Sequence, residues 1–215
     1  METKTYTILD AIKHLRENSP KRSFVQSFDV AVNISNIDLK KPENKISKEI
    51  ILPHARSKKM RVCIISDNIK NLSVDGAEVT VLGKSAVTDF ESNKNAAKKF
   101  SATYDFFIAE AALMPLVGKV LGRHLGPRGK MPKLLPPGRN PENFVKEAES
   151  SVRLRIKDSP VIHCVVGDEK MSDEQINENI EKVVDEVKKA LPGKSQIKNV
   201  YLKLTMGMAL KLGVR

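Results

Sequence analysis

Residues 121–141, LGRHLGPRGKMPKLLPPGRNP, combine four glycines, three arginines and two lysines without one acidic residue. Glycines relieve the steric cost of backbone bends, and arginine and lysine side chains bind phosphate groups. Three kinds of segment fit this composition. They are the phosphate-binding loop of an enzyme, a basic arm that binds nucleic acid, and an ordinary solvated loop.

A nucleotide-binding loop requires a stricter pattern than this segment has. The Walker motif needs a glycine, four residues and then Gly-Lys-Ser/Thr, but Gly129-Lys130 is followed by Met131, and His124 occupies the first glycine position. The apolar stretch RVCIIS leads into DNIKNL, which lacks the glycines of a dinucleotide fingerprint. The four histidines show no metal-ligand spacing, and no Gly-x-Ser-x-Gly elbow occurs. We therefore predict no catalytic residue, no metal and no cofactor.

The distribution of charge favours a polyanionic partner. The 215 residues include 37 basic and 26 acidic side chains, giving a net charge of +11. Residues 50–66, 111–141 and 187–215 contain no acid, whereas 168–186 are strongly acidic. Such a field attracts nucleic acid. A membrane partner is not expected, because no apolar run reaches the roughly 18 residues of a spanning helix and no basic amphipathic helix has an aromatic face.

Both cysteines, Cys63 and Cys164, lie in apolar, strand-like runs. This placement predicts buried, reduced thiols and an intracellular protein.

The two ends of the chain share one pattern of strands and amphipathic helices. A helix is predicted at 7–17 and an alternating strand at 24–34, in which Gln26 and every second residue after it form one face. A short strand is predicted at 49–54, and two strands begin at 151 and 161. Ser172 and Gln175 form a capping box before the longest helix, and a last strand spans 197–207.

The middle of the chain alternates apolar strands with helices, which is typical of a parallel sheet covered on both faces. Helices are predicted at 68–73, 85–90, 93–103, 113–121 and 141–149, with the basic segment as a long arm. The predicted fold class is α/β with two domains. A discontinuous α+β domain comprises 1–58 and 151–215, and a three-layer, Rossmann-like α/β domain, 61–149, is inserted into it.

The stretch LGPRGKMP closely resembles the signature of the large-subunit ribosomal protein one family, in its archaeal and eukaryotic type. Four further stretches resemble the same family: SFVQSFDVAVNI, LPHARSKK, YDFFIAEAALMPLVGKVLG and NVYLKLTMG. Together they cover nearly the whole chain. Ala55, Ser57 and Met208 depart from the family's common glycine, glycine and proline.

The resemblance implies that the terminal domain grips a bent element of 23S-type rRNA and that the inserted domain faces the E-site tRNA. The implied rRNA-binding residues are Phe24, Ser27, Asp29, His54, Arg56, His163, Thr205, Met206 and Gly207. The implied tRNA-facing residues are Arg123, Arg128, Lys130 and Lys133. The implied function is that of a cytoplasmic, ribosome-associated constituent of the mobile stalk, which assists release of deacylated tRNA and represses translation of its own mRNA.

Other readings remain open from the residues alone. Core packing is the simpler role for Phe24 and Met206, and a structural role is the simpler one for His163. The protein as a whole could instead be an α/β nucleotide-dependent enzyme, or a basic scaffold without preference among RNAs.

Overall fold

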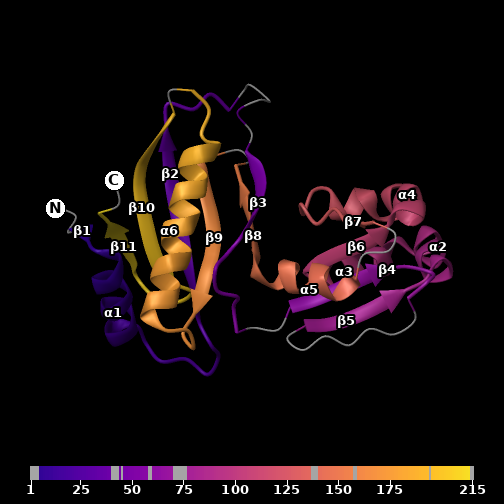
Figure 1. Cartoon of the computed structure of the whole chain (residues 1–215), viewed down its shortest axis with the longest axis horizontal. Helices are drawn as coiled ribbons and strands as arrows, with labels where there is room; N and C mark the ends of the chain where they lie inside the picture. Colours follow the sequence, from indigo (N-terminus) through magenta and orange to yellow (C-terminus); the bar gives the residue numbers. More distant parts are fainter. Residues whose placement is uncertain are drawn as a thin grey trace. The chain divides into compact units, whose positions relative to one another are not determined.

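The computed structural model describes residues 5–39, 44, 46–57, 60–69, 77–136, 140–156, 159–193 and 195–213. The chain divides into two compact units (Figure 1). The terminal unit comprises Met1–Ser57 and Ser150–Arg215, and the inserted unit comprises Lys58–Glu149. Both contain helices and strands, so the predicted α/β class is confirmed.

The terminal unit is built on a five-stranded sheet in the order β1-β11-β10-β2-β9. Its strands are β1 (Thr5–Tyr6), β11 (Ala209–Leu212), β10 (Gln196–Leu204), β2 (Ser27–Ser35) and β9 (Val161–Asp168). All neighbours are antiparallel except β1 and β11. The alternation predicted for β2 is confirmed, because Phe28, Val30, Val32 and Ile34 are all buried.

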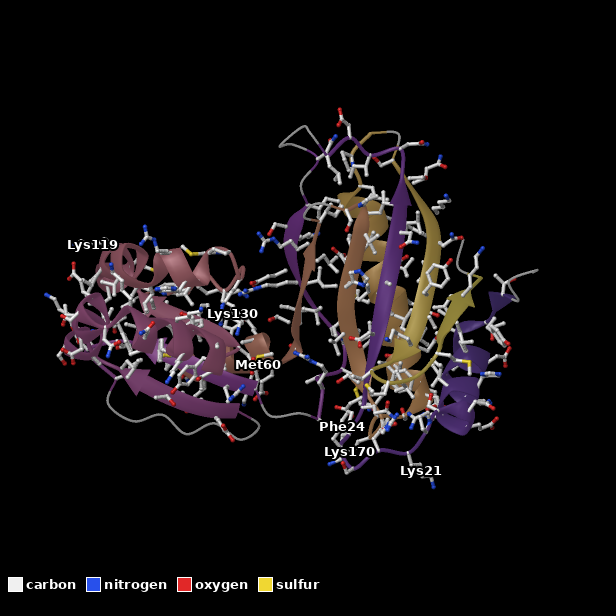
Figure 2. All side chains as sticks on the ribbon, turned by 180° about the vertical axis from the view of Figure 1, so that it is seen from behind. Lys21, Phe24, Met60, Lys119, Lys130 and Lys170 are labelled. Carbon is white, nitrogen blue, oxygen red and sulfur yellow. The ribbon has the colours of Figure 1, made fainter. Side chains whose placement is uncertain are left out.

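Helices α1 (Ile8–Asn18) and α6 (Asp173–Ala190) cover one face of this sheet (Figure 1). Thr7 caps α1, and the predicted capping box of Ser172 and Gln175 begins α6. A two-stranded antiparallel sheet of β3 (Ser47–Ile51) and β8 (Ser151–Arg155) completes the core. Among the described residues, no helix covers the opposite face of the large sheet, which Figure 2 shows from behind. That face is called the open face below.

The inserted unit has a four-stranded parallel sheet in the order β5-β4-β6-β7. The strands are β5 (Ala77–Leu82), β4 (Met60–Ile65), β6 (Phe106–Glu110) and β7 (Lys133–Leu135). Helices α2 (Lys84–Ser92), α3 (Lys94–Thr103) and α4 (Met114–Leu125) pack on one face. A short 3-10 helix, η2 (Ala111–Leu113), directly precedes α4. Helix α5 (Pro141–Ser150) packs on the other face. These layers agree with the predicted three-layer arrangement.

The expectation of a long basic arm is wrong. Helix α4 continues past Gly122 to Leu125, a turn follows, and β7 joins the sheet beside β6. Glycine within a helix costs about 1 kcal/mol, but burial of Leu121 and Leu125 outweighs that cost. Gly129 closes the turn with φ of +69°, a conformation that favours glycine.

Two smaller expectations also differ from the structure. The predicted last strand ends at Leu204, after which a turn leads into β11. The helix predicted at 68–73 lies mostly outside the described residues, and its two described positions are not helical.

The two cysteines are buried and free, as predicted. Burial raises the pKa of each thiol, Cys63 and Cys164, to about 12. Within the described ranges, no helix is long and apolar enough to cross a membrane. The same residues contain no group of three or more side chains suited to a metal ion.

Candidate nucleic-acid interface

Several residues singled out in the sequence meet at one end of the five-stranded sheet. Strand β2 begins there, and β9 and β10 end there, since Ser27 pairs with Asp168 and Phe28 pairs with Leu204. The turn 205–207 follows directly after β10. We call this end of the sheet, with the loop 24–26 and the turn 205–207, the strand-end surface.

Thr205 is fixed to the first residue of β2. Its backbone N–H donates to the carbonyl oxygen of Ser27 at 3.1 Å. Its Oγ1 accepts from the Ser27 N–H at 3.1 Å and donates to the Ser27 carbonyl oxygen at 3.3 Å. The hydroxyl group therefore holds the turn 205–207 against β2, and it retains acceptor capacity for a ligand.

Two large apolar side chains project from the strand-end surface. Phe24 is 49% exposed and Met206 is 54% exposed, so the core-packing interpretation of both is wrong. Val25 and Met208, which lie close to them in sequence, are also exposed, and neither was predicted as a site residue. Figure 2 labels Phe24 at this end of the terminal unit. Exposed apolar groups of this kind are available to stack on bases or sugars.

Gly207 is required by close packing. A Cβ atom at this position would lie 2.7 Å from Oγ of Ser19, the residue that ends α1, and 3.1 Å from Cβ of Leu204. The Gly207 N–H donates to the Leu204 carbonyl oxygen at 3.0 Å. The glycine thus allows the turn to lie directly against α1.

Asp29 lies on the open face of β2 in a partly buried, positively charged environment. Burial raises the pKa of its carboxyl group, while the charges of Lys203, His163 and Arg56 act in the opposite direction. Lys203 is its direct partner across the strands. Lys203 was not predicted as a site residue, although its position between the buried Leu202 and Leu204 indicates an outward side chain.

The segment that carries His54 and Arg56 is anchored by buried polar side chains. Asn179, fully buried on α6, accepts from the His54 N–H at 3.1 Å and donates to the His54 carbonyl oxygen at 3.0 Å. The His54 ring lies 2.7 Å from Oε2 of Glu178. The buried Asp168 accepts from both the N–H and the hydroxyl group of Ser57.

His163 is exposed on β9, the strand next to β2, where it pairs with Ala31, two residues along β2 from Asp29. The terminal unit therefore brings eight of the nine predicted rRNA-binding residues to the strand-end surface or its anchored neighbour segment, with His163 further along the open face.

The four basic residues predicted to face tRNA all lie in the inserted unit, where two have exposed side chains and two contact other residues of the unit. Arg123 on α4 and Arg128 in the following turn have exposed side chains. Lys130 Nζ donates to the carbonyl oxygen of Tyr104 at 2.5 Å, directly after α3. Lys133 Nζ lies 5.0 Å from the centroid of the Phe106 ring. Lys130 therefore stabilises the end of α3, a role that the sequence analysis did not predict.

An open sheet face with hydroxyl groups, exposed apolar side chains and cations at one end is typical of proteins that bind structured RNA. The comparisons agree with this class. The family model described as "Ribosomal protein L1p/L10e family" matches residues 14–208. The chain is 42% identical to the large ribosomal subunit protein uL1 of Pyrococcus horikoshii over 207 residues, which cover 95% of this chain and 94% of that protein.

The chain is also 41% identical to the protein of the same name from Methanothermobacter thermautotrophicus, over 95% of this chain and 98% of the relative. The chain belongs to the ribosomal protein L1p/L10e family, and it is similar to archaeal members, as its sequence predicts. Membership of a family of ribosomal proteins confirms that the protein is not an enzyme, and the nucleotide-dependent alternative is set aside.

Proposed function

We propose that the protein is a structural constituent of the large ribosomal subunit and that its terminal unit binds large-subunit rRNA through the strand-end surface. The relatives it matches over almost their full length are named as proteins of that subunit. The observation that carries the proposal is the turn 205–207, which is held on Ser27 by Thr205 while Phe24 and Met206 project to solvent.

The chemistry of this surface suits a folded RNA better than a regular duplex. Structured RNA is recognised by shape, by 2′-hydroxyl groups and by splayed bases. The Ser27 side chain and the Thr205 hydroxyl group offer hydrogen bonds to ribose, and Phe24 offers a ring on which a base or sugar can pack. The Asp29 carboxylate repels phosphate but can accept hydrogen bonds from hydroxyl or amino groups of the RNA. Lys203 and Arg56 attract the phosphates of the RNA backbone.

Helix α6 makes the two faces of the terminal unit differ in charge. It covers the face of the sheet opposite the open face, and it presents exposed carboxylates at Glu174, Glu178, Glu181 and Asp185. These charges repel phosphate and disfavour RNA on the helical side. The proposed RNA therefore approaches the strand ends and the open face.

The finer functions implied by the resemblance belong to the same proposal. Arg123 and Arg128 of the inserted unit are exposed and suit sequence-independent contacts to the phosphates of a transient tRNA at the exit site. Repression of the protein's own mRNA would use the strand-end surface, provided that the mRNA folds into a similar shape.

The proposal is tested by titrating the protein with a transcript of the stalk-forming region of large-subunit rRNA and with a scrambled transcript of equal length. We expect tighter binding to the stalk transcript, and the difference should persist as salt is raised, because shape-specific contacts depend less on salt than phosphate contacts do. Equal affinities would favour a basic scaffold without preference among RNAs.

A further inference from the structure

We infer that Gln26 is a positioning residue for RNA recognition. Its side chain does not touch the RNA but fixes the loop 24–26 and the turn 205–207 relative to one another. The inference rests on the proposed function of the strand-end surface. Gln26 was expected only to face the core, and its burial is nearly complete, with 1% of its surface exposed.

The Gln26 amide group is hydrogen-bonded on both sides. Oε1 accepts from the backbone N–H of Met206 at 3.1 Å. Nε2 donates to Oε1 of Glu169 at 3.0 Å and to the carbonyl oxygen of Pro20 at 3.3 Å. Three segments far apart in the sequence therefore meet at one buried side chain.

The backbone of Gln26 is bound to Glu169 as well. The Gln26 N–H donates to Oε2 of Glu169 at 3.0 Å, and the Glu169 N–H donates to the Gln26 carbonyl oxygen at 3.1 Å. Both oxygens of the Glu169 carboxylate are therefore used by one residue. Such a closed arrangement of hydrogen bonds around the buried Gln26 leaves little freedom for the chain on either side.

Arg16 holds the other side of Glu169. Its guanidinium group donates to the carbonyl oxygens of Glu169 at 2.8 Å and Met171 at 2.6 Å, and it forms an ion pair with Asp173 at 2.8 Å. The loop after β9 is thereby fixed to α1. Through its hydrogen bonds to Glu169 and to the Met206 N–H, Gln26 links this fixed loop to the turn that carries Met206.

The position requires an amide rather than a carboxylate. The oxygen of Gln26 faces an N–H donor, and its nitrogen faces a carboxylate and a carbonyl oxygen, which only accept. Glutamate at this position would set a second carboxylate against Glu169. Repulsion between the two carboxylates would then displace the side chain at position 26. The exposed side chains of Phe24 and Met206 would no longer be held in fixed positions relative to one another.

The test uses four forms of the full chain and the stalk transcript: the parent, Gln26→Glu, Glu169→Gln and the double variant. We expect Gln26→Glu to lower affinity about tenfold or more, since it removes the donor to Glu169 and Pro20 and sets two carboxylates against each other. The double variant should regain most of this loss, because the amide introduced at position 169 can donate to the carboxylate introduced at position 26. The one contact that the double variant does not restore is the hydrogen bond to the carbonyl oxygen of Pro20.

Val184→Ala is the matched control for stability. Val184 is buried on the core side of α6, about three helical turns after Asp173, and takes no part in these polar contacts. We expect this variant to lower the thermal unfolding midpoint while keeping the affinity of the parent. If Gln26→Glu does not fold, Gln26→Met replaces it, with an equal loss of affinity expected and no recovery from Glu169→Gln.

A folded Gln26→Glu variant with parental affinity would overturn the inference. So would a loss of affinity in Val184→Ala as large as that in Gln26→Glu at the same loss of stability. A parent protein that does not distinguish the stalk transcript from the scrambled one would instead overturn the proposed function.

Discussion

Ser27 and Thr205 lie 178 positions apart in the sequence, yet three hydrogen bonds join them, two of which use the Thr205 hydroxyl group. The hydroxyl group bridges the N–H and the carbonyl oxygen of Ser27. A side chain that binds both ends of one residue defines the direction of the turn as well as its distance from β2. We therefore expect Thr205 to contribute to RNA binding mainly by holding the turn 205–207 in position, and less by direct contact with the RNA.

Thr205→Ala is expected to weaken binding to the stalk transcript about tenfold or more, because a polar group left unpaired beneath bound RNA costs about 1–3 kcal/mol and the turn loses its support. Thr205→Ser keeps the hydroxyl group and should bind within about threefold of the parent. Fluorescence titration measures both, with circular dichroism as the test of folding. An alanine variant that binds as the parent does would remove Thr205 from the interface.

Gly207→Ala is expected to destabilise the terminal unit by about 1–3 kcal/mol, the usual cost of overpacking. The new Cβ atom would lie 2.7 Å from Oγ of Ser19. Adding Ser19→Ala removes that oxygen and should recover part of the loss. Urea unfolding of the two single variants and the double variant measures the recovery. Strictly additive effects would show that the two residues do not compete for space.

Asp29→Asn is expected to change how stability depends on pH. Burial raises the pKa of Asp29 above its ordinary value of 3.8, so ionisation is harder in the folded state than in the unfolded one. The carboxyl group stabilises the fold fully below that ordinary value, and the contribution is lost as pH rises through the raised pKa. Asparagine does not titrate.

The thermal midpoint of Asp29→Asn minus that of the parent should therefore increase as pH rises above 3.8 and then level off. The measurement is a series of thermal melts in buffers of constant ionic strength. If the difference decreases with pH instead, Lys203, His163 and Arg56 stabilise the ionised form more than burial destabilises it.

Lys130→Gln is expected to destabilise the inserted unit by about 1–2 kcal/mol, since its ammonium group binds the carbonyl oxygen that follows α3. Arg128→Gln is the matched control, because Arg128 lies in the same turn with an exposed side chain. Neither variant should change affinity for the stalk transcript. Equal stabilities of the two variants would contradict the structural role of Lys130.

A shortened chain that joins 1–57 to 150–215 through a short linker is expected to fold and to keep most of the rRNA affinity. The core of the terminal unit contains only residues from these two segments, and so does the strand-end surface. Circular dichroism and the same titration test both points. A folded protein without affinity would assign the rRNA contacts to the inserted unit.

Local patterns in the sequence predicted much of this fold. The capping box and apolar stripe of α6, and the alternation of β2, are visible within 20 residues. Strand β7 was missed, because its three residues follow a proline and become a strand only by pairing with β6. The end of α4 was placed too early, because burial of Leu125 depends on packing that a local pattern does not show.

The candidate site was predictable only in part, for a similar reason. The resemblance supplied Ser27 and Thr205, and alternation placed Gln26 toward the core. Neither source showed that Gln26 binds Glu169, 143 positions away, or that Lys130 reaches Tyr104, 26 positions away. Pairings of this kind depend on the closed tertiary structure.

The order of strands has a consequence for synthesis on the ribosome. Strand β10 lies between β2 and β11, and the chain reaches it only after the whole inserted unit has been made. The inserted unit can fold while the chain is still growing. Strand β2, although translated early, has to wait for β10 with the hydrogen-bonding groups of that edge unpaired. An unfinished nascent chain therefore cannot yet present the turn 205–207 beside Ser27, and selective RNA binding becomes a property of the finished polypeptide.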